Sequence, residues 1–139
     1  MSNSNAINNH VSIVKTYFQA FNEGRTKDML ALLHPEVEHD INQGKTQIGV
    51  ESFIKFMEHM DQCYKEELKN IIFFTSETGG RISAEFDVHG TYLKTDGNLP
   101  LARGQEYVIR AGSFFEVVDQ KIKRVTTYYN LPLWIEMVK

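Results

Sequence analysis

The sequence has one cysteine, three prolines and no long hydrophobic run, and these scarcities remove several classes of protein. A single cysteine, Cys63, cannot form an internal disulfide, so a disulfide-stabilised secreted scaffold is excluded. No apolar stretch approaches the roughly 20 residues that cross a bilayer as a helix, and residues 1–9 lack a basic-then-apolar leader pattern. We therefore expect a cytoplasmic protein with no membrane partner.

Basic charge and cofactor motifs are also missing. The formal net charge is −3, and no Lys/Arg cluster interleaves with aromatic residues, which argues against a nucleic-acid partner. There is no phosphate-binding G-x-x-x-x-G-K loop, no G-x-G-x-x-G turn and no G-x-S-x-G elbow. The five histidines show no spacing typical of a zinc site. We expect no cofactor and no metal.

Helical spacing marks the first half of the chain, after a flexible segment over residues 1–9. A second, short helix is expected over 26–33, a strand over 36–43 and a third helix from Gly49 to Tyr64. The first helix carries a stripe of apolar residues with a period of three to four: Ile7, Val11, Val14, Phe18 and Phe21.

The period changes to two in the second half, which predicts strands over 68–77, 81–92, 106–118 and 121–130. The centre of the first of these, Ile71 to Phe74, is apolar at every position, so we expect both of its faces to be covered. Residues 131–139 form a short apolar tail, expected to be a docked helix.

Helices followed by antiparallel strands predict a single α+β domain over residues 10–139, in which three helices pack on a curved antiparallel sheet. A curved sheet wrapped around a long helix leaves a conical space where a small molecule could bind, although a filled core would have the same pattern. The polar and aromatic outer faces of the later strands favour a homodimer.

Two residues could supply chemistry inside such a space. Tyr17 lies on the flank of the first helix's stripe, and Asp40 lies on the strand that leaves the helical layer. A carboxylate between apolar walls has a raised pKa and is a better proton acceptor, and a nearby phenol can stabilise developing negative charge. Spacing alone leaves open that Tyr17 is a core residue and Asp40 a cap. His39 is the alternative to Asp40, because neighbours on a strand face opposite ways.

Several blocks resemble a known superfamily. Residues 14–24 (VKTYFQAFNEG) and 29–37 (MLALLHPEV) are similar to the opening of the nuclear-transport-factor-2-like superfamily, which includes ketosteroid isomerases and SnoaL-like polyketide cyclases. Residues 39–44 (HDINQG), 102–105 (ARGQ), 112–116 (GSFFE) and 124–131 (RVTTYYNL), with Trp134, resemble the ketosteroid isomerase-related proteins within it. The likeness spans residues 10–138 and implies the conical α+β fold of this superfamily.

The resemblance also implies roles for particular residues. Tyr17 stands where the isomerases place the tyrosine that hydrogen-bonds the dienolate oxygen, and Asp40 matches their general base if one residue is deleted before it. Their second, protonated aspartate falls here at Gly112 or Ser113, so steroid isomerisation itself is not implied. The expected ligand-binding residues are Phe18, Asn42, Phe53, Met57, Phe86, Ser113 and Phe115.

The hypothesis from the sequence is a cofactor-independent isomerase or cyclase that moves a proton next to a carbonyl. Its ligand would be a small, apolar, cyclic or polyketide-like compound, with Asp40 as the base and Tyr17 as the hydrogen-bond donor. The alternatives are a non-catalytic binding module or a dimerisation module of the same fold.

Overall fold

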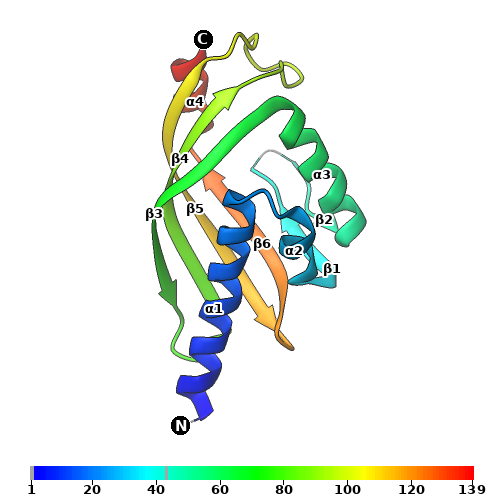
Figure 1. Ribbon diagram of the computed structural model, residues 1–139, viewed down its shortest axis with the longest axis vertical. Helices are drawn as coiled ribbons and strands as arrows, with labels where there is room; N and C mark the ends of the chain where they lie inside the picture. The colour runs from blue at the N-terminus through cyan, green and yellow to red at the C-terminus, as the bar shows by residue number, and fades with distance from the viewer. Residues whose placement is uncertain (1, 43) are drawn as a thin grey trace.

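A computed structural model gives the structure of residues 2–42 and 44–139. Its elements alternate between helices and strands early in the chain and are almost all strands later (Figure 1). In chain order they are α1 (Ser2–Asn22), α2 (Thr26–Ala31), β1 (Leu33–Asp40), β2 (Gln47–Ile48), α3 (Val50–Cys63), β3 (Tyr64–Thr75), β4 (Arg81–Tyr92), β5 (Glu106–Val118), β6 (Lys121–Tyr129) and α4 (Leu131–Val138).

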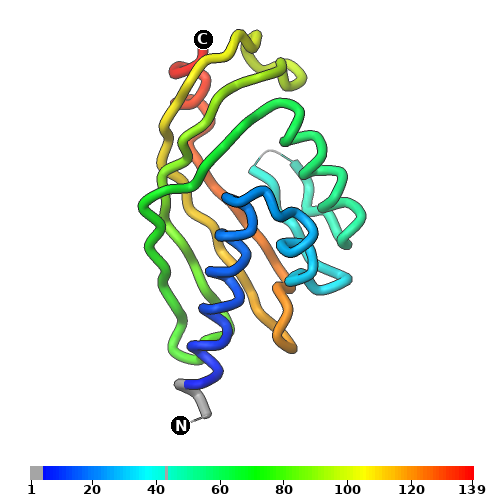
Figure 2. Tube along the Cα trace, viewed as in Figure 1, coloured from blue at the N-terminus to red at the C-terminus, as the bar shows by residue number. Residues whose placement is uncertain are grey.

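The strands form one six-stranded sheet in the order β2-β1-β6-β5-β4-β3. Every neighbouring pair is antiparallel except β1 and β6, which run parallel. The sheet curves around α1 and α3, which lie on its inner face, and α4 packs at the end of the sheet next to the C-terminus (Figures 1 and 2). The expected α+β architecture, with helices on one face of a curved sheet, is confirmed.

Helix α1 contributes more buried apolar residues than any other helix in the described ranges. Val14, Phe18 and Ala20 are buried by the sheet, because the apolar stripe turns toward it. The helix ends where Gly24 adopts a φ of 72°, a conformation that glycine takes without steric cost. There the amide of Gly24 donates to the carbonyl of Phe21, and that of Arg25 donates to the carbonyl of Ala20.

Several expected boundaries differ from the structure. Residues 2–9, expected to be flexible, belong to α1, and the remaining residue of that segment, Met1, lies outside the described residues. Strand β1 begins at Leu33 rather than at 36, so α2 is shorter than expected, and Gln43, the expected strand end, also lies outside the described residues. Strand β3 begins at Tyr64, directly after α3, rather than at Leu68.

The expectation that the centre of β3 is covered on both faces is wrong within one chain. Ile72 is 55% exposed and Phe74 is 53% exposed, because α1 and α3 cover only the other face of the sheet (Figure 1). Other apolar side chains of β5 and β6 are exposed on the same side of the sheet. We call this set the outer-face patch: Ile72, Phe74, Val108, Phe114 and Tyr128.

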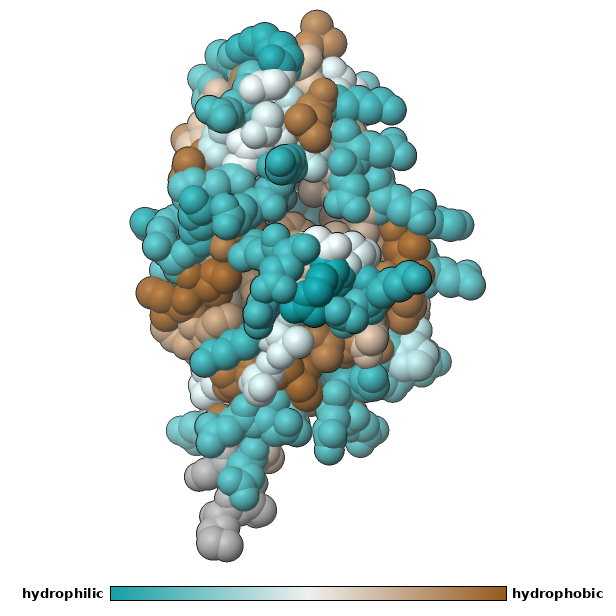
Figure 3. All heavy atoms as spheres, in the orientation of Figure 1, coloured by the Kyte–Doolittle hydropathy of each residue, from teal (hydrophilic) through white to brown (hydrophobic). Residues whose placement is uncertain are grey.

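The opposite side of the molecule looks different. The face that carries α1 and α3 is mainly hydrophilic, with apolar side chains in separate areas (Figure 3).

None of the helices in the described ranges combines the length and apolar character that a membrane-spanning helix needs.

We propose that two copies of the chain pair through the outer-face patch, because a group of exposed apolar side chains on one face often marks a protein interface. Light scattering at micromolar concentration should report twice the mass of one chain. Phe114→Glu, which places a charge in the middle of the patch, should shift the protein to monomer. Gln62→Glu adds the same charge on the helical face, at an exposed position of α3, and should leave the dimer intact. A wild-type monomer across dilution would contradict the proposal.

Candidate functional site

A cavity of about 1220 Å³ lies between the inner face of the sheet and helices α1 and α3. Its wall exposes more apolar than polar surface, and polar side chains are interspersed along it. The volume exceeds that of a drug-sized ligand pocket, which is typically about 300–1,000 Å³. The polar side chains of the wall include Tyr17, His39, Asp40, Asn42, Tyr64, Glu66, Asp96, Tyr107, Ser113, Thr127 and Tyr129.

Most of the residues expected at the site do lie on this wall. They are Tyr17, Phe18, Asn42, Phe53, Met57, Phe86 and Ser113. Asp40 borders the cavity, but its carboxylate is bonded to Thr126 on the outer face of the sheet. Phe115 is instead buried in the core behind Tyr17, with the two ring centroids 5.4 Å apart. That these residues bind a ligand stays a prediction.

Tyr17 reaches the cavity from α1. Its ring packs edge-on against Phe18 and Phe115, and no described residue forms a hydrogen bond with its hydroxyl. Burial raises the pKa of Tyr17 above its ordinary value, so the phenol stays protonated. A protonated, unpartnered hydroxyl can donate a hydrogen bond to a ligand oxygen.

Asp40 has a different environment from the one expected of a buried base. Its carboxylate accepts hydrogen bonds from Thr126 and Thr46, each at 2.6 Å. These bonds stabilise the anion and lower the pKa of Asp40, with a smaller contribution from nearby Arg124. The raised pKa expected from the sequence is therefore corrected, because the carboxylate faces the outer side of the sheet, where hydroxyl groups donate to it, and not the apolar cavity.

His39 takes the buried position next to Asp40. Its ring lies between Phe53 and Phe56, with centroid distances of 4.4 and 4.6 Å. Burial lowers the pKa of His39 to about 4, so the imidazole is neutral at physiological pH. Its Nδ1 atom is buried without a partner among the described residues.

Ser113, expected near the second oxyanion position, is paired with another hydroxyl. Its Oγ lies 2.7 Å from Oγ1 of Thr127, and both residues line the cavity. Two hydroxyls carry two protons and share one hydrogen bond, so one proton is left to donate elsewhere. The pair can therefore serve a ligand oxygen.

Glu66, on β3, is the polar residue that the sequence interpretation missed. Its carboxylate lies half-buried at one end of the cavity and accepts a hydrogen bond from the hydroxyl of Tyr107. Desolvation raises the pKa of Glu66, and the Tyr107 bond offsets this in part. Glu66 thus has the property that was expected of Asp40.

The sheet register explains how Tyr107 reaches Glu66. Gly90 on β4 pairs with Glu66 on one side and with Tyr107 on the other. A Cβ atom on Gly90 would overlap the Tyr107 ring, so the ring crosses β4 through the space that glycine leaves. Trp134 of α4 packs edge-on against the same ring, at 5.7 Å between centroids.

The next row of the sheet makes the surroundings of Glu66 apolar. Leu68, Val88 and Ile109 are paired across β3, β4 and β5 in that row, and all three line the cavity. Tyr129 also belongs to this wall, and the pKa of its phenol is raised, first by burial and then by the charge of Glu66. Glu66 and Tyr129 are therefore within electrostatic reach of each other.

Tyr17 and Glu66 occupy opposite ends of the cavity. Tyr107, the partner of Glu66, and Ser113 are six residues apart on β5, which is about 20 Å of extended strand. Tyr17 packs against Phe115, two residues further on. An elongated ligand could contact both ends, whereas a single ring could contact only one.

The pattern of alternation could have identified Glu66. Tyr64, Glu66 and Leu68 alternate on one face, but Lys65-Glu66-Glu67 has the composition of a solvated turn after a helix. The strand was expected to begin at Leu68, which left Glu66 outside it. Only the continuation of β3 back to Tyr64 places this carboxylate on the cavity wall.

Comparison with known proteins assigns the family. The sequence profile of the SnoaL-like domain matches residues 14–125. The chain therefore belongs to the SnoaL-like family of the nuclear-transport-factor-2-like superfamily, as its fold and central cavity suggest. None of the curated proteins with which it was compared matches it significantly.

Solved structures support the same assignment. A candidate polyketide cyclase of Pseudomonas putida is 50% identical, with a TM-score of 0.89 over 91% of this chain and 96% of that one. Another candidate polyketide cyclase, of Xanthomonas campestris, is 43% identical, with a TM-score of 0.93 over 96% of this chain and 99% of that one. A phenazine biosynthesis-related protein of Pseudomonas aeruginosa, 17% identical over 99% of this chain and 89% of that one, has a TM-score of 0.80 and shares the fold.

The space above Gly90 can be tested by substitution. Gly90→Ala should lower the free energy of unfolding by about 1–3 kcal/mol, because the new methyl group overlaps the buried Tyr107 ring. Gly112→Ala is the matched control on β5, since its Cβ would lie 3.7 Å from the carbonyl oxygen of Ala84, an ordinary contact. Urea unfolding of both variants measures the difference. Equal stability of the two would contradict the described packing.

The raised pKa of Glu66 predicts a pH dependence of stability. The folded protein holds the Glu66 proton more tightly than the unfolded chain does, so this residue's contribution to stability is full below the ordinary pKa of 4.5 and is lost as the pH rises through the raised value. Glu66→Gln should therefore be more stable than wild type at neutral pH, and the advantage should shrink on acidification toward pH 4.5. An advantage that grows on acidification would mean that the pKa is lowered.

Proposed function

We propose that this protein is a cofactor-independent enzyme that moves a proton next to a carbonyl group of a small cyclic or polyketide-like molecule. The observation that carries the proposal is Glu66, a carboxylate with a raised pKa on the apolar wall of a large cavity. Perturbed carboxylates in clefts are typical of catalytic acids and bases.

Glu66 is the proposed base. Its carboxylate would take a proton from the carbon next to the carbonyl, and the C–H bonding electrons would move into the new C=C bond as the carbonyl oxygen becomes an enolate. The Tyr107 hydroxyl donates to one carboxylate oxygen and holds the group in place, which leaves the other oxygen for the substrate. A raised pKa brings a carboxylate closer to the pH at which the enzyme works, and this makes it a more effective base than an ordinary carboxylate.

Tyr129 is the proposed donor to the enolate oxygen. Its phenol lines the cavity, stays protonated because burial raises its pKa, and lies within electrostatic reach of Glu66. A preorganised hydroxyl in a water-poor site stabilises negative charge that appears during the reaction. The enolate could then regain the proton at another carbon, which is isomerisation, or attack a second carbonyl of the same molecule, which is cyclisation.

Tyr17 is proposed to bind a ligand oxygen at the far end of the cavity. The 43–50% identical structures named as candidate polyketide cyclases favour a ligand of several rings or several carbonyl groups, long enough to reach both ends. Asp40, held by Thr46 and Thr126, is the weaker candidate for the base.

Binding without turnover is the second candidate function. The cavity with its unpartnered Tyr17 hydroxyl would hold a carbonyl compound whether or not a proton moves. Trp134 is the single tryptophan of the chain and lines the cavity, so its fluorescence can report binding independently of chemistry.

Proton exchange separates the two functions. With 2-tetralone in D₂O, wild type should accelerate loss of the NMR signal of the protons next to the carbonyl. Glu66→Gln should slow this exchange by about 100- to 10,000-fold, the usual contribution of a general base. Tyr129→Phe should slow it by about 100-fold, and Tyr17→Phe should leave the exchange of this short ketone unchanged, because Tyr17 lies at the other end of the cavity. Trp134 fluorescence reports binding of the ketone to each variant.

Asp40→Asn is the control for the assignment of the base, since it removes the carboxylate that the sequence favours for that role. If Asp40→Asn abolishes exchange and Glu66→Gln does not, the base is Asp40. If the fluorescence reports binding but the ketone exchanges its protons no faster with wild type or any variant than in buffer alone, the protein is a binding module.

A further inference from the structure

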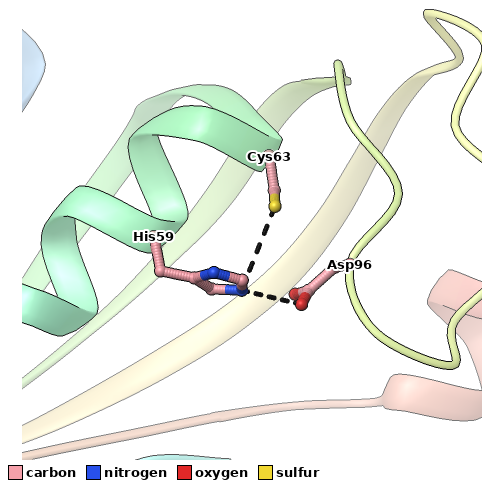
Figure 4. A group of neighbouring side chains, drawn as sticks. All are labelled: His59, Cys63 and Asp96. Atoms are coloured by element: carbon pink, nitrogen blue, oxygen red, sulfur yellow. Dashed lines mark hydrogen bonds and ion pairs between the residues drawn. The ribbon is translucent and has the colours of Figure 1, made fainter.

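We propose that the rim of the cavity binds one Zn²⁺ ion through His59, Cys63 and Asp96. We call these three residues the rim cluster. Their donor atoms, an imidazole nitrogen, a sulfur and a carboxylate oxygen, all lie within 4.8 Å of one another. His59 and Cys63 come from the last turn of α3, and Asp96 comes from the loop between β4 and β5 (Figure 4).

The three donor atoms of the rim cluster are arranged as ligands of one ion. They are not arranged as a nucleophile activated by a histidine. Nε2 of His59 lies 2.7 Å from Oδ1 of Asp96 and 3.9 Å from Sγ of Cys63. In a nucleophile–histidine–acid triad, the two partners contact different ring nitrogens. Here sulfur and carboxylate converge on the same nitrogen, and Figure 4 shows Nδ1 on the far side of the ring.

The distances fit a tetrahedral zinc site after small movements. Zinc bonds of about 2.0–2.3 Å to nitrogen, oxygen and sulfur place neighbouring donors roughly 3.3–3.6 Å apart. The histidine–carboxylate distance would need to open, and the histidine–sulfur distance to close, by less than about 1 Å each. Because His59 is 52% exposed, its side chain can make this adjustment and an ion can enter.

The surroundings hold the other two ligands in place. The hydroxyl of Tyr64 donates to Oδ2 of Asp96 at 2.7 Å, which leaves Oδ1 directed at His59. The backbone amide of Leu93 donates to the carbonyl of Cys63 at 2.7 Å, so the loop is tied to the end of α3. Such outer contacts orient metal ligands and tune their affinity.

A fourth position of the ion would remain for water or for an oxygen of a bound ligand. Three protein donors plus an open position are the arrangement of zinc sites that contact substrates. His59, Asp96 and Tyr64 all line the cavity, at the end where Glu66 lies. The proposal does not depend on the assignment of Glu66 as a base.

Cobalt(II) is the probe for this site, since it replaces zinc and is coloured. Metal-free protein titrated with Co²⁺ should bind one equivalent and develop a thiolate-to-cobalt charge-transfer band with tetrahedral visible bands. Added Zn²⁺ should remove both. Cys63→Ser should abolish the charge-transfer band. His59→Gln removes a ligand, so it should weaken Co²⁺ binding by more than about 100-fold, the most that loss of an outer contact usually costs.

Two further variants sharpen the test. Tyr64→Phe keeps the ring but loses the bond to Asp96, and should weaken Co²⁺ binding by about 10-fold. His89→Gln, on the outer face of β4, is the matched control and should bind like wild type. Should Cys63→Ser fail to fold, the exposed His59 variant decides. A wild type without the charge-transfer band, or an unchanged spectrum in His59→Gln, would overturn the proposal.

Discussion

The hydrogen bond between Tyr107 and Glu66 is the interaction on which the candidate site depends. It joins β5 to β3 across β4, is possible only because Gly90 leaves room for the Tyr107 ring, and holds a half-buried carboxylate on the cavity wall. A buried carboxylate without such a partner would be costly. Trp134 of α4 packs on the same tyrosine ring, so Tyr107 supports both the candidate site and the C-terminal helix.

Asp40 and Glu66 illustrate how environment, rather than residue type, decides chemistry. Glu66 lines the cavity, whereas Asp40 follows the inward-facing His39 and directs its carboxylate to Thr126 on the outer face of the sheet. Hydroxyl donors from Thr126 and Thr46 stabilise the Asp40 anion and lower its pKa, whereas desolvation raises that of Glu66. An anion that is already well hydrogen-bonded gains little by accepting a proton, and a poorly solvated one gains more. This contrast favours Glu66 over Asp40 as the base.

Much of the fold could be predicted from the sequence, because periodicity reports which face of an element is buried. The alternation of Ile82, Ala84, Phe86 and Val88 and the stripe of α1 predicted their buried faces. The parallel pairing of β1 with β6 and the early start of β3 could not be predicted, since they depend on contacts distant in sequence. Tyr17 was identified from a local pattern, whereas Glu66 becomes a site residue only through Gly90 and Tyr107, residues 24 and 41 positions away.

The central claim is that Glu66 is a desolvated carboxyl group restrained by Tyr107. The most direct measurement is an NMR titration of its carboxyl carbon, in wild type and in Tyr107→Phe. The account predicts a midpoint above the ordinary pKa of 4.5 in wild type and a higher one in Tyr107→Phe, where the bond that lowers the pKa is lost. A midpoint at or below 4.5 in wild type would contradict it.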